Sequence, residues 1–309
     1  MTKLSRKLLI SVFALAFALI TLGASTFAWF TLTSVAEIDS LDMDIIAGNF
    51  MEISLDGDVY KTFFTSDEIK GAIIEGDGVG ELRTLPRLDA VTTTDGKTFL
   101  DLEDGTTNSY LSFKIWFKSY EEGSMVYLDS GTEVASTSKL WKSDQRFQYR
   151  GGTVEVNQEL PIFAGNAMRF SIEETDNTHL APLEEGIGMN IFELGHDDVN
   201  TPDRRLDQET KTDGLLAYWL AKTEEEIDVE EGFLPEVLDR SHLGSAATAQ
   251  IATTHQVVEV EGQNTSYIGF AIVRIWLEGW DPDCFDAVLN SKMSITFSFS
   301  VAVPAVPEP

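Results

Sequence analysis

The sequence is poor in cysteine, in histidine and in positive charge, and each shortage excludes a class of protein. With Cys284 as its single cysteine, the chain forms no intrachain disulfide, so a stable fold depends on buried apolar surface. The 22 basic residues stand against 51 acidic ones, and the resulting net charge of −29 repels nucleic acid. We therefore expect no nucleic-acid partner, whereas cations, basic polymers and a salty medium are compatible with such a polyanion.

Sequence motifs of common enzymes are also absent. There is no Gly-x-Ser-x-Gly, no His-Glu-x-x-His, no glycine-rich phosphate loop and no Cys-x-x-Cys. The run Asp129-Ser130-Gly131 matches the turn of aspartic proteases, but those enzymes pair two carboxylates and the motif occurs once. We predict an ordinary turn there and a protein that is not an enzyme. A secreted hydrolase or metalloprotease is the third interpretation.

A long apolar run occurs only near the N-terminus. Three basic residues lie among the first seven positions, the run extends from Leu8 to Leu22, and small residues follow at 23–25. This order is typical of a secretory signal, and fifteen apolar residues are fewer than the roughly 20 that span a bilayer. We predict a signal peptide at 1–28, with cleavage after Ala24 as the alternative.

Cleavage after Ala28 leaves residues 29–309, which we predict to form a single domain that is secreted or associated with the cell surface. With a hydrophobic content of 43%, a chain of this length can bury a large core. Because the sequence has no second long apolar stretch, we expect no permanent membrane anchor once the signal is removed.

Alternation of apolar and polar residues is the clearest periodic pattern in the chain. It occurs at 51–55, 111–118, 168–172 and 294–303, and it is typical of antiparallel strands with one buried and one wet face. Residues 267–277 are apolar at nearly every position, which predicts a central strand covered on both faces. We therefore predict a mainly β protein, an antiparallel β-sandwich of jelly-roll-like architecture.

Helical patterns are few. Asp281 and Pro282 are typical of the start of a short helix, and residues 213–227 have apolar side chains at helical spacing. The second stretch lies within 173–262, which contains 22 acidic and 5 basic residues and has weak strand patterning. We interpret 173–262 as a long acidic, partly helical insertion in the sandwich, with a separate small domain as the alternative.

Candidate metal ligands gather in the same insertion, which holds all four histidines. His196, Asp197 and Asp198, with Asp203 nearby, offer the nitrogen and oxygen atoms that zinc prefers. Calcium needs six to eight oxygen atoms, and the acidic, glycine-containing runs at 56–58, 75–78 and 101–105 could supply some of them. Ordinary β-turns explain these runs as well, so we expect no cofactor, with calcium as the alternative.

Two short segments resemble a known family. The run Thr-Phe-Ala-Trp-Phe-Thr at 26–31, followed by Ile-Ile-Ala-Gly-Asn-Phe-Met-Glu-Ile at 45–53, resembles the camelysin/TasA-type exported matrix proteins of Gram-positive bacteria. The resemblance covers about 30 residues, and Ile46 and Asn49 stand where that family tends to have threonines. It implies a jelly-roll sandwich that is processed by a dedicated signal peptidase and, in some relatives, assembles into fibres of the biofilm matrix.

The new N-terminus predicted by this cleavage is extended and apolar, because it begins Trp29, Phe30, Thr31, Leu32. Such a segment can add a strand to a sheet edge of a neighbouring molecule, or it can pack into its own domain. We predict a secreted, non-enzymatic structural or matrix protein that associates with itself or with other matrix components. The alternative is a secreted carbohydrate- or ligand-binding β-sandwich, with surface tryptophans stacking on sugar rings. The candidate tryptophans are Trp141, Trp219 and Trp280.

Overall fold

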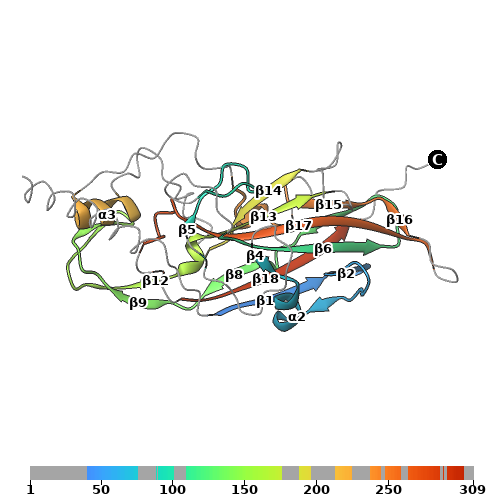
Figure 1. The fold of residues 1–309 in the computed structure, drawn as a ribbon, viewed down its shortest axis with the longest axis horizontal. Helices are drawn as coiled ribbons and strands as arrows, with labels where there is room; N and C mark the ends of the chain where they lie inside the picture. The colour runs from blue at the N-terminus through green and yellow to red at the C-terminus, as the bar shows by residue number, and fades with distance from the viewer. Residues whose placement is uncertain are drawn as a thin grey trace, which may run out of the picture. The chain divides into compact units, whose positions relative to one another are not determined.

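A computed structural model gives the fold in two compact units, Met1–Val35 and Ala36–Pro309, and the residues it describes all lie in the second (Figure 1). The predicted signal peptide at 1–28 and residues 29–32 lie outside the described residues. The described residues are 40–75, 88, 90–100, 109–175, 188–195, 213–224, 237–244, 248–258, 264–285, 288 and 291–302.

Two sheets make up most of the described structure, so the predicted β-sandwich is confirmed (Figure 1). The eight-stranded sheet has the order β14 (Met189–Glu193), β13 (Met168–Glu174), β17 (Ser266–Glu278), β6 (Leu111–Ser119) and β2 (Met51–Ser54), with β16 (Gln256–Val258) and β5 (Ala90–Val91) beside β17 and β4 (Ile74–Glu75) beside β6. The six-stranded sheet has the order β15 (Gln250–Thr254), β7 (Ser124–Leu128), β18 (Lys292–Ala302), β1 (Ser40–Ala47) and β3 (Phe63–Phe64), with β8 (Glu133–Ser136) beside β18.

Smaller elements complete the described part of the chain. The described helices are α2 (Ser66–Ala72), α3 (Leu215–Thr223) and the short 3-10 turns η1 (Ala164–Ala167) and η3 (Arg240–His242). Two hairpin-like pairs join β9 (Lys139–Lys142) to β12 (Glu159–Ile162) and β10 (Phe147–Tyr149) to β11 (Gly152–Val154). None of the described helices has the length and apolar character needed to cross a bilayer.

The main core lies between the two sheets, where the apolar members of the alternating patterns meet. Phe113 of β6 packs edge-on against Phe297 of β18, with ring centroids 5.8 Å apart, and Phe170 of β13 lies 5.1 Å from the same ring. Phe117 and Phe299 form a similar contact at 5.1 Å. Because each such ring contributes roughly 1.5–3 kcal/mol when it leaves water, these inward rows are the main source of stability.

The first and last described strands lie side by side and parallel, which differs from the wholly antiparallel sandwich predicted. β1 pairs with β18 over its full length, from Ser40 opposite Lys292 to Ala47 opposite Phe299. At the end of this pairing the Gly48 N–H donates to the Phe299 carbonyl at 2.7 Å. A Cβ atom at this glycine would lie 2.9 Å from the same oxygen, so the close approach requires glycine.

The outer face of the eight-stranded sheet is covered at β13, so the predicted wet face is wrong for that strand, whereas Lys114 and Lys118 on the outward side of β6 are half-buried. Arg169 and Ser171, on the outward side of β13, are both fully buried. Residues 92–100 lie over this face, because the Ser171 hydroxyl donates to the Gly96 carbonyl at 2.7 Å and Phe99 stacks on Tyr110 at 4.0 Å. A segment far away in sequence therefore removes these polar positions from water.

Residues 173–262 contribute strands to both sheets. β14 pairs with β13, β15 pairs with β7 in the six-stranded sheet, and β16 pairs with β17 in the eight-stranded sheet. The chain therefore passes from one sheet to the other between Thr254 and Gln256. The helix predicted within 213–227 is confirmed over Leu215–Thr223 as α3, which packs near β10, and residues 225–227 lie outside the described residues.

The short helix predicted to begin at Asp281 is wrong for residues 281–285, which form turns and a bend. The Asp281 Oδ1 atom accepts a hydrogen bond from the Asp283 N–H at 2.8 Å. An N-cap side chain makes the same bond, so Asp281 behaves as predicted, but the residues after it continue as turns and a bend instead of a helix. Cys284 is buried as predicted, although it lies in this turn.

Candidate functional site

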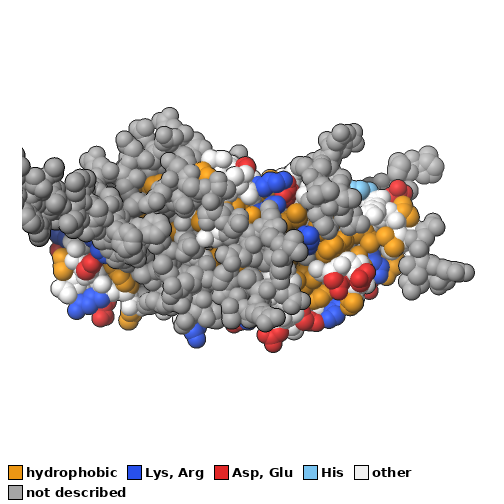
Figure 2. Space-filling model, in the orientation of Figure 1, with side chains coloured by type: hydrophobic (Ala, Val, Ile, Leu, Met, Phe, Trp, Pro, Cys, Tyr) orange, Lys and Arg blue, Asp and Glu red, His pale blue; other side chains and the backbone are white. Residues whose placement is uncertain are grey.

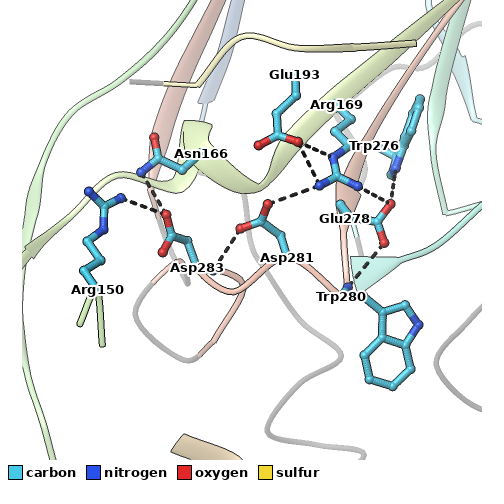
Figure 3. A network of polar contacts seen from close by, with 9 residues as sticks. All are labelled: Arg150, Asn166, Arg169, Glu193, Trp276, Glu278, Trp280, Asp281 and Asp283. Carbon is cyan, nitrogen blue, oxygen red and sulfur yellow. Dashed lines mark hydrogen bonds and ion pairs between the residues drawn. The ribbon is translucent and has the colours of Figure 1, made fainter. Parts of the chain in front are cut away.

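A buried cluster of charged side chains lies where β13, β14 and the end of β17 meet (Figure 3). We call Arg169, Glu193, Glu278 and Asp281 the Arg169 cluster. The guanidinium Nη2 lies 2.8 Å from Glu193 Oε2 and 3.3 Å from Asp281 Oδ2, and Nη1 lies 3.3 Å from Glu278 Oε2. Strand register brings the first pair together, since Arg169 is directly opposite Glu193 on β14. The other carboxylates come from the end of β17 and the turn after it.

Burial makes this cluster electrostatically unusual. The side chains of Arg169 and Glu278 are 0% exposed and that of Asp281 is 2% exposed, so three carboxylates surround one guanidinium in a region of low dielectric constant. Burial raises the pKa of Asp281 well above its ordinary value, and the negative charges of Glu193 and Asp283 raise it further, against the opposing effect of Arg169. The cluster therefore favours an added proton on this carboxyl group.

Hydrogen bonds extend from the cluster into neighbouring loops. Glu278 accepts from the Trp276 indole N–H at 3.1 Å and from the Trp280 backbone N–H at 3.3 Å (Figure 3). Asp283 accepts from Arg150 Nη2 at 2.9 Å and from Asn166 Nδ2 at 3.0 Å. These bonds tie the turn after β17 to the β10–β11 hairpin and to η1.

The chemistry open to the Arg169 cluster is structural. A general acid or base must reach a substrate, and the carboxyl groups of Glu278 and Asp281 are shielded from solvent. Nearby Cys284 is also buried, and burial together with Asp281 raises the pKa of its thiol, so the reactive thiolate is disfavoured. Within the described ranges, no group of three or more His, Cys, Asp or Glu side chains is arranged to hold a metal ion.

A second set of side chains lies at the surface, at the end of β6 and around the hairpin that follows β2. We call Phe50, Val59, Tyr60 and Tyr120, with the ion pair of Lys118 and Glu52, the Tyr60 patch. The Lys118 ammonium donates to Glu52 Oε2 and lies 4.8 Å from the centroid of Tyr60 and 5.4 Å from that of Tyr120. Phe50 is 84% exposed, Val59 53% and Tyr120 47%.

The predicted metal ligands and the predicted assembly segment lie outside the described residues. These are His196, Asp197, Asp198 and Asp203 for the metal, and Trp29, Phe30, Thr31 and Leu32 for assembly. Both sets stay predictions. The turn predicted at Asp129-Ser130-Gly131 is confirmed, because the Thr132 N–H donates to the Asp129 carbonyl at 2.9 Å.

The acidic run at 56–58 forms a tight turn that uses its own carboxylate. Asp56 Oδ1 accepts from the backbone N–H groups of Asp58 and Val59, both at 2.9 Å. These bonds lower the pKa of Asp56, as expected for a carboxylate that accepts backbone hydrogen bonds. The ordinary turn explains this run, whereas 76–78 and 101–105 lie outside the described residues.

The tryptophans predicted to bind sugars are not surface residues. Trp219 is 6% exposed and Trp280 is 8% exposed, so neither presents a ring to solvent. Trp141 is half-buried and packs edge-on against Phe147, Tyr218 and Phe285. The surface-tryptophan basis for sugar binding is therefore wrong, and exposed aromatic rings occur instead in the Tyr60 patch.

Sequence reasoning missed both groups of residues. Arg169 was interpreted as part of a wet face because it alternates with Met168 and Phe170, and its partner Asp281 lies more than a hundred positions away. Charged residues inside otherwise apolar strands were the available signal. Comparison of the chain with protein-family models, curated proteins and solved structures gives no match in any of the three. The resemblance to camelysin/TasA-type proteins therefore stays a prediction.

Proposed function

We propose that this protein is exported and works outside the cytoplasm as a non-enzymatic structural or matrix protein. The basic, apolar and small-residue order of positions 1–28 supports export, and the β-sandwich supports a structural role. The observation that supports the non-enzymatic part of the proposal is the burial of the Arg169 cluster away from solvent. Its acidic groups hold neighbouring loops together and present no open acid–base pair to a substrate.

Assembly by strand addition is the second part of the proposal. Among the described strands, β18 covers one edge of β1, whereas β3 pairs on the other edge only with Ile45 and Ile46. Further along that edge α2 lies against β1 and the Met43 N–H donates to Ser66 Oγ at 3.1 Å, so an added strand would have to replace this bond. We propose that residues 29–32 of one molecule pair with this edge of the next.

The length of chain before β1 is compatible with such an exchange. Residues 33–39 separate the assembly segment from β1, and seven extended residues reach about 23 Å. When each molecule adds a strand to the same edge of the next, the contact is head-to-tail. Such contacts build a filament unless the rotation between successive molecules closes them into a ring. The repeated main-chain hydrogen bonds and the burial of two aromatic rings would favour that growth.

Two measurements test the proposal separately. N-terminal sequencing of secreted material is expected to start at Trp29, and a start at Met1 would contradict cleavage. Removal of residues 29–32 is expected to leave a folded monomer with unchanged circular dichroism and no filaments by electron microscopy. A shortened chain that unfolds would show that the segment belongs to its own core, and filaments formed without it would contradict strand donation.

A further inference from the structure

The hairpin beneath the Tyr60 patch occurs twice in this molecule. Residues 53–61 and 92–100 have the same loop length, because Ile53 bridges Lys61 and Thr92 bridges Leu100. In the first, the Gly57 N–H donates to Ser54 Oγ at 2.9 Å, and the two residues after this glycine donate to Asp56 Oδ1. In the second, Gly96 donates to Thr93 Oγ1 at 2.9 Å, and the next two residues donate to Asp95 Oδ1.

The two hairpins differ in how far they bury the aromatic residue three positions after the glycine. Phe99 is buried against Tyr110 and the edge of Trp276, with centroids 4.0 and 5.1 Å apart. Its counterpart Tyr60 is only half-buried, and the Tyr60 hydroxyl oxygen has no hydrogen-bond partner among the described residues. The shared turn therefore does not impose an open aromatic surface, and the open surface belongs to the first hairpin alone.

Phe50 adds a second unusual feature at the same place. It has a φ of +66°, the left-handed region that disfavours a residue with a side chain, and it exposes most of its ring to water. Both features cost free energy, and glycine or asparagine at this position would relieve them. Met51 pairs with Ser119 at the end of the β2–β6 ladder, and Phe50 and Tyr120 are the residues just beyond this pair, one on each chain segment. The two most exposed rings of the patch therefore flank the same end of the ladder.

The charges inside the patch balance, because Glu52 pairs with Lys118, and the exposed residues that adjoin it in sequence add negative charge. Lys118 Nζ lies between two tyrosine rings and Glu52. Asp58, Glu121 and Glu122 are exposed nearby in sequence. Burial raises the pKa of Tyr60 to about 12, and the negative charges of Asp56, Asp58 and Glu52 add to that effect. Figure 2 shows hydrophobic and acidic side chains beside each other in the region of β6 and β2.

We propose that the Tyr60 patch binds a cationic polysaccharide, a chain of hexosamine units with free amino groups. A pyranose ring has an apolar C–H face that stacks on the rings of Phe50 and Tyr120, and its ammonium group at the ring edge pairs with the surrounding carboxylates. A net charge of −29 draws such a polymer to the protein and repels polyanions. The flexible alkyl side chains of a basic peptide would stack on flat aromatic rings over a smaller area than a pyranose face does, so the amino sugar is favoured.

This site goes beyond the proposed function, because it involves no residue of the assembly segment. The test is isothermal titration of the purified full chain with a water-soluble glucosamine hexamer, with the N-acetylated hexamer and polylysine as comparison ligands. We expect binding of the free-amine hexamer that weakens as salt concentration rises, and at least tenfold weaker binding of the neutral, acetylated one. Equal binding of the two hexamers, or no binding of either, would overturn the proposal.

Variants locate the site. Phe50→Gly suits the left-handed backbone, so it is expected to keep the melting temperature while lowering affinity at least fivefold. Tyr120→Ala and Asp58→Asn are each expected to lower affinity severalfold, and Leu140→Ala, at an exposed leucine of β9, is the matched control with no effect. Unchanged affinity in Phe50→Gly would contradict the site. Polylysine that binds as tightly, with the same dependence on Phe50 and Tyr120, would identify a basic protein as the partner instead.

Discussion

The outward residues of β18 and those of β13 come from the same kind of sequence and have opposite environments. On β18 the outward residues are hydroxyl-bearing and half-exposed, and exposed carboxylates of β1 flank them; Asp42 lies opposite Ser294, and Asp44 lies opposite Thr296. On β13 the outward residues are Arg169, Ser171 and Glu173, and all are buried. Alternation thus identifies the side of a strand that faces the core, but not whether water or another chain segment covers the other side.

The largest effect on this comparison is expected from the guanidinium at the centre of the covered face. Arg169→Ala leaves the buried carboxylates of Glu278 and Asp281 without their counter-charge, which typically costs about 3–5 kcal/mol of unfolding free energy. Urea unfolding followed by circular dichroism measures it. A loss below about 1 kcal/mol, within the range of ordinary surface substitutions, would show that this face is open to water in solution.

A smaller effect is expected from substituting Gly96, which lets residues 92–100 pack closely against β13. Gly96 has a φ of +69°, and a Cβ atom there would lie 2.9 Å from Ile191 Cδ1 and 3.2 Å from Ser171 Cβ. Gly96→Ala combines backbone strain with overpacking, so we expect a loss of about 1–3 kcal/mol. Gly151→Ala is the control for strain alone, because its φ is +71° and nothing lies within 4 Å of the added atom. Equal losses in both variants would contradict close packing of residues 92–100 against β13.

The pH dependence of stability sharpens the comparison further. The pKa of Asp281 is raised in the folded state, because of burial, then Glu193 and Asp283, so the folded protein binds this proton more strongly than the unfolded chain does. Its contribution therefore falls as pH rises from the unfolded value near 4 towards the folded pKa. Asp281→Asn is expected to flatten the decline in melting temperature between pH 5 and pH 8.

Carboxylates with a lowered pKa act in the opposite sense. Backbone hydrogen bonds from Val59 and Asp58 lower the pKa of Asp56, and this contribution is lost as pH falls through the folded value. Asp56→Asn is therefore expected to change the acid side of the profile and leave the slope above pH 5 as it is. If the melting temperature of Asp281→Asn falls between pH 5 and pH 8 as steeply as that of the original protein, Asp281 is not the cause of that decline.

The smallest effect is expected on the open face. Thr296 lies on the outward side of β18, half-exposed, between Asp44 of β1 and Glu133 of β8. Thr296→Ala is expected to change the unfolding free energy by no more than about 0.5 kcal/mol, apart from a small loss of strand propensity. A loss of several kcal/mol, measured in the same urea series, would mean that something covers this face as well.

Local patterns carried most of what the sequence could predict about the fold. The alternation around Phe297 predicts β18, the apolar run around Val273 predicts the doubly covered β17, and helical spacing around Trp219 predicts α3. Each depends on neighbours within one element, where side-chain periodicity follows directly from backbone geometry. These parts of the fold are therefore readable without knowing any long-range contact.

The features that sequence patterns did not predict depend on contacts between distant parts of the chain, or on a residue type that is compatible with more than one local structure. The Arg169 cluster needs Glu278 and Asp281, which come close only through the pairing of β13 with β17 and through the turn that follows β17. The helix expected at Asp281 does not form over 281–285 although the carboxylate binds the Asp283 N–H as an N-cap would, so a capping signal alone does not decide how the chain continues. The Tyr60 patch was missed because an exposed aromatic residue has the same sequence signature as a buried one.

The parallel pairing of β1 with β18 has a kinetic consequence. Each pair in that ladder joins residues about 250 positions apart, so the six-stranded sheet closes only after nearly all of the chain is available. The entropy of closing so long a loop is lost before the contacts across it form, which makes this folding step slow and late. A chain of this topology therefore cannot complete its six-stranded sheet until residues 292–302 are available.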